Sequence, residues 1–206
     1  MSKDELNNCI TDTRKRENEW FYHGLNTSYK IEEDFINIFE NGLLCPFLRH
    51  TDSGGYNGKF YVSLSKCVEG ISIYDSSYLS ISTNNIGFII DGIKPIKTKH
   101  YKDASILQKL LSLRVSGYYD EYQQFLKVEP ANFVGVQMSL GTIQRSLENN
   151  PTYLRFLSDI LKYLISIEST MPFYGFDDPF GDLYLLDKPK TYELIDSSIS
   201  RIEDRI

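Results

Sequence analysis

Apolar residues recur at three- and four-residue steps in two parts of the chain, and this spacing is typical of amphipathic helices. The first part, residues 28–44, ends near an Asn-Gly pair that commonly closes a helix. The second, residues 142–170, has a wide apolar face and a proline cap near residue 151. Residues 192–204 form another predicted helix.

Shorter runs rich in aromatic and β-branched residues, bounded by Gly, Pro or Asn, predict strands. They cover residues 20–26, 59–65, 87–91 and 119–138, the last of these broken at Pro130. Between residue 172 and the last helix the chain is acidic and interrupted by Pro, so we expect little regular structure there.

This order of elements predicts an α+β fold. Residues 1–19 are polar and show no periodicity, which indicates a lead-in or a surface helix. Residues 20–140 form the mixed body, and residues 141–206 form a helical C-terminal extension that packs on the body. No internal repeat or low-complexity tract divides the chain further.

Composition narrows the class of protein. A hydrophobic content of 41% and a charged content of 24% are those of ordinary soluble domains. The net charge of −6 argues against a chain held to nucleic acid by bulk electrostatics. Three cysteines without a metal-binding spacing predict neither a disulfide framework nor a zinc site, and reduced thiols suit synthesis in the cytoplasm. No segment reads as a signal peptide or membrane span, so we expect no membrane partner, although delivery by a signal-less route stays open.

Three short segments stand out within the predicted body. They are YHG (22–24) at a strand end, GYNGKFYVSLSK (55–66) entering an aromatic strand, and DEYQQFLKV (120–128) opening a strand with acidic residues. Each has an ordinary explanation by itself. A histidine at a strand end commonly makes a structural hydrogen bond, an Asn-Gly pair commonly marks a hairpin, and acidic residues at a strand entrance are commonly solvated.

Taken in order, with IFENGLL (38–44) between the first two, these segments resemble the ADP-ribosyltransferase family. The similar branch carries a His-Tyr-Glu constellation and includes poly(ADP-ribose) polymerases and diphtheria-toxin-like enzymes. Its members have YHG[ST], a helix followed by GL, G-[KR]-G-[IF]-Y-F, and NEY-[IV]-[IV]-Y. The resemblance covers about residues 20–138. It implies an ADP-ribosyltransferase-like split β-sandwich with flanking helices and NAD bound, as a substrate, between its two halves.

The resemblance also implies a role for each matching residue. His23 would bind the adenosine ribose of NAD, and the backbone of Gly24 would pair with the nicotinamide carboxamide. Tyr61 would stack on the nicotinamide ring, and Glu121 would bind the nicotinamide ribose and stabilise charge at the reacting carbon. Tyr74 is the candidate for a second stacking aromatic, at a spacing that departs from the family's.

Cleavage of NAD by this route needs the same residue types. Cleavage of the bond between ribose and nicotinamide develops oxocarbenium-like charge on the sugar, as in glycoside hydrolysis. A fixed carboxylate stabilises that charge more in the transition state than in the ground state. The reaction needs no metal, and the sequence signals none.

Several positions depart from the family pattern. Leu25 follows His-Gly where a hydroxyl residue is common, and Asn26, Thr27 or Ser28 could take its place. Tyr119 stands two positions before Glu121, where arginine-modifying relatives have an acid, so that acceptor is less expected. Tyr118 or Tyr119 could instead contact the acceptor by stacking. Asp120 is the rival carboxylate at the same strand entrance, and Glu121, followed by Tyr, fits the pattern better.

A basic segment, residues 93–102, interrupts the acidic chain with Lys94, Lys97, Lys99, His100 and Lys102. It is interpretable as a sheet-edge strand protected from aggregation by its lysines, or as a contact for pyrophosphate or a nucleic-acid acceptor.

The leading hypothesis is an NAD-dependent mono-ADP-ribosyltransferase. It would transfer ADP-ribose to a macromolecular acceptor, protein or nucleic acid, and the resemblance suggests a microbial or phage toxin or effector. One alternative is an RNA 2′-phosphotransferase-like enzyme, which the small number of arginines in the body disfavours. Another is a non-catalytic module that binds ADP-ribose or a protein. The sequence does not specify the oligomeric state.

Overall fold

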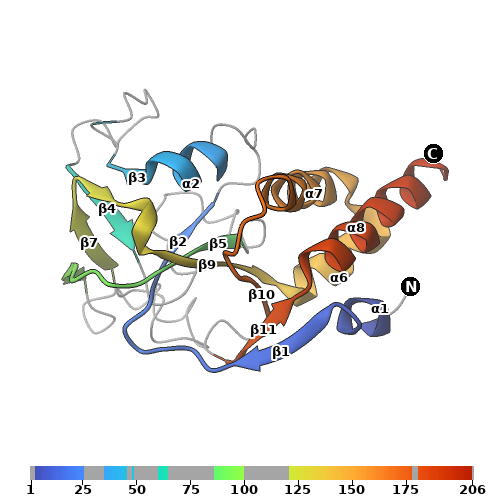
Figure 1. The fold of residues 1–206 in the computed structure, drawn as a ribbon, viewed down its shortest axis with the longest axis horizontal. Helices are drawn as coiled ribbons and strands as arrows, with labels where there is room; N and C mark the ends of the chain where they lie inside the picture. Colours follow the sequence, from blue (N-terminus) through green and yellow to red (C-terminus); the bar gives the residue numbers. More distant parts are fainter. Residues whose placement is uncertain are drawn as a thin grey trace, which may run out of the picture.

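A computed structural model describes residues 3–25, 35–45, 48, 60–64, 86–99, 121–177 and 181–205. These residues form a mixed fold of α-helices and β-sheets, as the α+β prediction expected (Figure 1). The described helices are α1 (Lys3–Asn7), α2 (Asn37–Asn41), α6 (Leu140–Asn149), α7 (Pro151–Ser166) and α8 (Lys188–Glu203), with a 3₁₀ turn, η4 (Pro130–Asn132).

The largest sheet has six described strands in the order β1-β11-β10-β9-β5-β2. The pair β9 and β10 is parallel, and the other pairs are antiparallel. The strands are β1 (Ile10–Arg14), β2 (Phe21–Gly24), β5 (Ile86–Ile90), β9 (Phe133–Ser139), β10 (Phe173–Phe176) and β11 (Leu183–Leu186).

Two smaller sheets complete the described strands. One has the order β4-β7-β6, and the other pairs β3 with β8. Figure 1 shows the three-stranded sheet at one end of the molecule and helices α6 and α8 toward the other. These strands are β4 (Tyr61–Leu64), β6 (Ile96–Lys99), β7 (Glu121–Phe125), β3 (Leu43–Leu44) and β8 (Lys127–Val128).

The six-stranded sheet is apolar on both faces. Along β5 all five residues are buried, and alternation sends Phe88 and Ile90 into the large core while Ile89 faces the other side. The large core also contains the apolar faces of α6, α7 and α8. A second, smaller cluster lies on the opposite face and comprises Trp20, Tyr22, Ile89, Tyr174, Phe176 and Leu183.

The chain ends contribute to this sheet in a way that the sequence did not predict. The segment 141–206 was expected to be a helical extension, yet it supplies β10 and β11 as well as helices. Residues 1–19, expected to be a lead-in, supply β1, which pairs with β11. The runs FYGF and LYLL are only four residues long, which is too short for a clear periodicity.

Some helix boundaries followed the local signals and others did not. Leu43 and Leu44, predicted as the end of the first helix, form β3 instead, and α7 ends at Ser166 rather than at residue 170. Gly42 ends α2 with φ of 85° and donates its N–H to the carbonyl of Ile38, which confirms the Asn-Gly cap. The stretch predicted as helix over 142–170 is two helices, because Asn150 leaves helical geometry and Pro151 begins α7. The last predicted helix is α8, which begins four residues earlier than expected.

Candidate functional site

The predicted His-Gly pair lies at the end of β2, the last strand in the described order of the six-stranded sheet. His23 is opposite Phe88 of β5, and Gly24 is opposite Gly87. The strand begins buried at Phe21 and becomes partly exposed at His23 and Gly24. Packing therefore fixes one end of β2, while the end that carries the predicted site residues is accessible.

Tyr61 and Glu121 lie on neighbouring antiparallel strands of the three-stranded sheet. Tyr61 begins β4 opposite Phe125, and Glu121 begins β7 opposite Lys99 of β6. Because the two strands run in opposite directions, these residues stand at opposite ends of the β4–β7 ladder. Phe125, the partner of Tyr61, is four residue steps along β7 from Glu121, a distance of about 13 Å along the strand.

Alternation along β4 distinguishes its two faces. Val62 and Leu64 are buried in the large core, while Tyr61 is partly exposed on the other side. On β7, Tyr122 is in register with Leu64 and packs against the same core. One face of this sheet is therefore held by the core, and Tyr61 lies on the opposite face.

The two sheets meet through an aromatic pair next to the predicted site residues. The rings of Phe21 and Tyr122 lie edge to face, with centroids 5.0 Å apart. Phe21 precedes His23 by two positions on β2, and Tyr122 directly follows Glu121 on β7. Strand β2 also contacts β4. The structure thus brings together the strands that carry His23, Glu121 and Tyr61.

Sequence reasoning did not identify this aromatic pair. The sequence did contain two hints of it. Phe21 falls on the same alternating set of β2 positions as His23, and an aromatic residue directly follows the candidate glutamate. Neither residue type suggests a contact between sheets until the topology is known.

Other predicted residues lie outside the described part of the chain. They are the second stacking aromatic Tyr74, the acceptor-contacting candidates Tyr118 and Tyr119, the rival carboxylate Asp120, and Asn26, Thr27 and Ser28. Gly54, Gly55 and Gly58, which precede β4 in the sequence, also lie outside it.

The described part of the basic segment forms β6, which is an outer strand of the three-stranded sheet. Ile96 is 72% exposed, and the Lys97 ammonium lies 5.7 Å from the centre of the Tyr122 ring. This agrees with the interpretation as a lysine-bearing edge strand and also puts a cation beside the strand of Glu121. His100 and Lys102 lie outside the described residues.

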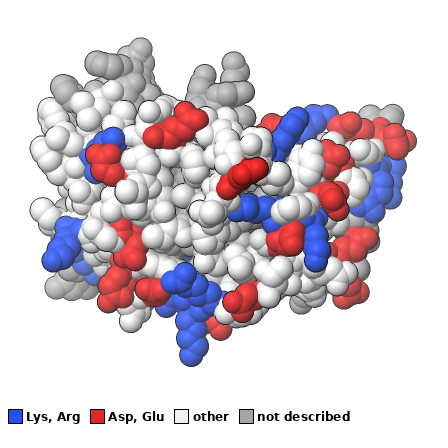
Figure 2. Space-filling view, in the orientation of Figure 1, with Lys and Arg blue, Asp and Glu red and all other residues white. Residues whose placement is uncertain are grey.

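Charge on the visible face is mixed. Figure 2 shows basic and acidic side chains interspersed over it, without a continuous basic stripe among the described residues. A site for nucleic acid on this face would therefore depend on a few local contacts rather than on a broad field.

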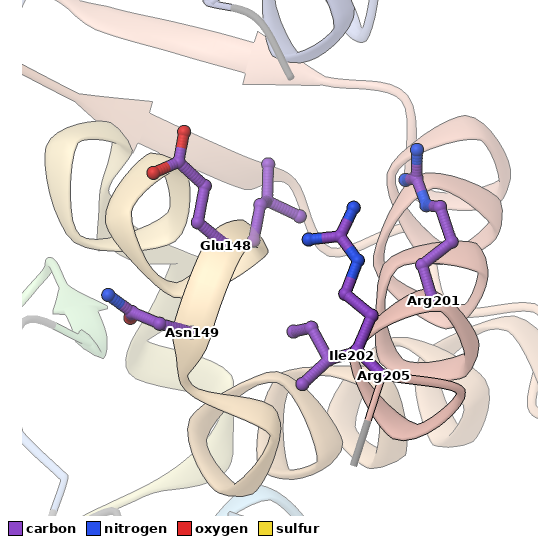
Figure 3. A pocket seen from close by; sticks show the side chains of 6 residues that line it. Glu148, Asn149, Arg201, Ile202 and Arg205 are labelled. Atoms are coloured by element: carbon purple, nitrogen blue, oxygen red, sulfur yellow. The ribbon is translucent and has the colours of Figure 1, made fainter.

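A surface hollow of about 400 Å³ lies away from these strands, between the ends of α6 and α8. Figure 3 shows Arg205 reaching from the end of α8 toward the space beside α6. The lining mixes charges of both signs and shares no residue with the predicted NAD site. It consists of Leu147, Glu148, Asn149, Arg201, Ile202 and Arg205.

No protein-family model, curated protein or solved structure matches this chain. In the described ranges, no group of three or more His, Cys, Asp and Glu side chains could hold a metal ion. Nor does any described helix have the length and apolar character to cross a membrane.

Proposed function

We propose that this chain is an NAD-dependent mono-ADP-ribosyltransferase with an ADP-ribosyltransferase-like split β-sandwich. The observation that carries the proposal is the Phe21–Tyr122 contact, at 5.0 Å between centroids. It joins β2 to β7 beside a His-Gly pair on one strand and a glutamate on the other. NAD would lie at the accessible edge of this junction, next to the partly exposed residues His23, Gly24 and Tyr61.

Each candidate residue has a distinct part in the reaction. His23 binds the adenosine ribose, and Gly24 lets the nicotinamide carboxamide approach the main chain closely, because it has no side chain. Tyr61 stacks on the nicotinamide ring. Glu121 binds the nicotinamide ribose and stabilises the positive charge that develops as the glycosidic bond breaks.

The register of the three-stranded sheet constrains this division of roles. By register, Glu121 belongs to the same alternating set of β7 positions as Phe125, the partner of Tyr61. The two positions are about 13 Å apart along the strand. The groups assigned to them, the nicotinamide ring and its ribose, are directly bonded, so both side chains would have to extend toward one another to reach them.

The acceptor is a protein or a nucleic acid, and a toxin or effector is the context that the sequence motifs suggest. An aromatic before the catalytic glutamate, Tyr118 or Tyr119, is the candidate for contact with that acceptor. The absence of a second acid two positions before Glu121 makes arginine a less expected target.

The test follows both halves of the reaction, using NAD labelled on the adenylate and a separate assay for free nicotinamide. We expect label on a protein or nucleic acid, and a loss of roughly 100-fold or more in Glu121→Gln, since a preorganised charge-stabilising group has an effect of this size. Glu129→Gln is the matched control, because Glu129 directly follows β8, forms an ion pair with Lys127 and is exposed. Binding of NAD without turnover, equal in all three proteins, would refute the proposal. Removal of a 2′-phosphate from RNA would point instead to the phosphotransferase alternative.

A further inference from the structure

Arg16 is fixed over the second face of the six-stranded sheet by four interactions. Its Nε donates to the carbonyl oxygen of Gly181 at 2.7 Å, and its Nη1 donates to Gln137 Oε1 at 2.7 Å. The guanidinium also lies over the rings of Tyr22 and Phe176, 5.4 Å from each centre. These contacts come from four segments of the chain, so the guanidinium has little freedom to turn.

Two donors at this point have no acceptor among the described residues. Arg16 Nη2 and Gln137 Nε2 are both buried, and neither makes a hydrogen bond to that part of the chain. The whole Gln137 side chain is 0% exposed. A buried donor without a partner is costly, and a native protein rarely leaves two of them side by side.

The charge is also uncompensated. Arg16 is only partly exposed, and a charge that is largely withdrawn from water normally has a counter-ion. Among the described residues, no carboxylate forms an ion pair with Arg16. A water molecule could accept one hydrogen bond, but it would leave the positive charge unbalanced.

From these observations we propose that Arg16 and Gln137 form a binding site for an oxyanion, a phosphate or carboxylate group. The two free donors belong to side chains joined by a single hydrogen bond, so one compact group with several oxygens could accept from both. Arginine suits such groups because its planar fork matches their geometry. The oxyanion would supply the missing acceptor for each donor and the missing negative charge.

The sheet register relates this site to the predicted NAD site. Gln137 pairs with Gly87, and Gly87 pairs with Gly24. Directly paired residues share a face, and two strand spacings amount to about 10 Å. Phe21 and, by alternation, His23 belong to the face that packs on the large core, so the oxyanion site meets the predicted NAD site only at Gly24 and does not depend on it.

The experiment measures the thermal unfolding midpoint of the full chain against inorganic phosphate, pyrophosphate, acetate and NAD. Chloride keeps the ionic strength constant. The variants are Arg16→Met, which removes the charge, and Gln137→Glu, which places an internal carboxylate beside the guanidinium. The matched control is Arg14→Met, since Arg14 also lies over an aromatic ring, that of Trp20, but already has an acidic partner in Glu17.

We expect a saturable rise of the midpoint with at least one oxyanion, a response at least tenfold weaker in both site variants, and an unchanged response in Arg14→Met. Gln137→Glu should also unfold at a higher temperature than the wild type without added anion. An unresponsive wild type, or site variants that respond like it, would overturn the inference.

The anion arms also separate this site from the proposed function. A response to phosphate or acetate without any turnover of NAD would leave the oxyanion site standing and refute the transferase. If NAD is turned over, the anions have no effect on the unfolding midpoint and Gln137→Glu leaves turnover unchanged, the transferase would stand and the oxyanion site would be refuted.

Discussion

Phe21 of β2 and Tyr122 of β7 meet edge to face, with ring centroids 5.0 Å apart and planes inclined at 68°. The contact joins two separate sheets. One ring is two positions from His23, and the other is next to Glu121. The spacing of the two proposed site residues therefore depends on a pair of side chains that do no chemistry.

Replacing Tyr122 with Leu should uncouple the two strands. It removes the edge-to-face pair and the Lys97 contact, so the free energy of unfolding should fall by about 1 kcal/mol or more. Release of nicotinamide should fall roughly 10- to 100-fold, because small displacements of reacting groups are costly to catalysis. Urea denaturation and an assay of nicotinamide release measure the two effects.

Phe39→Leu is the control for this prediction. Phe39 lies beside Phe35 and Tyr163, in a different aromatic group. Its loss should lower stability with little effect on turnover. Equal losses of turnover in the two variants would show that the Phe21–Tyr122 pair has no special role.

Gly42 should not tolerate a side chain. Its φ is 85°, and a Cβ there would lie 2.4 Å from the carbonyl oxygen of Val128. Its ψ is 171°, and this combination is adopted essentially only by glycine, so the backbone strain alone is about 1–3 kcal/mol and the clash adds to it. Gly42→Ala should therefore lower the free energy of unfolding by more than that amount, measured by urea denaturation.

Gly141→Ala is the matched substitution. Gly141 lies in the first turn of α6, and a Cβ there would meet no atom closer than 3.5 Å. Alanine favours helix over glycine by up to about 1 kcal/mol, so this variant should be as stable as the wild type or more stable. A similar loss of stability in both variants would contradict the role assigned to Gly42.

The hydroxyl of Tyr163 on α7 donates to Glu40 Oε1 on α2 at 2.7 Å. Burial, together with the hydrogen bond to Glu40, raises the pKa of Tyr163 from 10.0 to about 12. A folded-state pKa above the unfolded value contributes stability below pH 10 that is lost as pH rises toward 12. The wild type should thus be more stable than Tyr163→Phe at neutral pH, by roughly 0.5–1.5 kcal/mol, and this advantage should vanish above pH 12.

Measuring the difference between the two proteins across pH 8–12 cancels the titration of the remaining tyrosines. Glu40→Gln serves as the second variant, since it keeps an acceptor without the charge. An advantage that does not change with pH would contradict this coupling.

Asn150 separates α6 from α7 and caps the second helix. Its Oδ1 accepts from the Tyr153 N–H at 3.1 Å. Asn150→Ala should lower the free energy of unfolding by about 0.5–2 kcal/mol, while Asn150→Asp keeps the acceptor and should cost little. Chemical denaturation of the wild type and both variants measures these free energies of unfolding. Equal stability of the Asn150→Ala and Asn150→Asp variants would rule out the cap.

The sequence by itself determined the features that arise from neighbouring residues. Backbone preferences of single residues fix the end of α2 at Gly42 and the start of α7 at Pro151. A local run of apolar residues gives the buried strand around Phe88. The ordered motifs also identified three strands, β2, β4 and β7, that the structure brings into contact.

Only the tertiary structure decided which distant segments lie together. Strands β10 and β11 are runs of only four residues, too short to show a hydrophobic periodicity. They are strands because they pair with β9 and β1. Arg16 and Gln137 are 121 positions apart, and neither position signals the hydrogen bond between them. Local patterns are set by backbone sterics within one or two turns of chain. The pairing of sheets, the Phe21–Tyr122 contact and the partly buried guanidinium of Arg16 depend instead on burying the whole apolar surface at once.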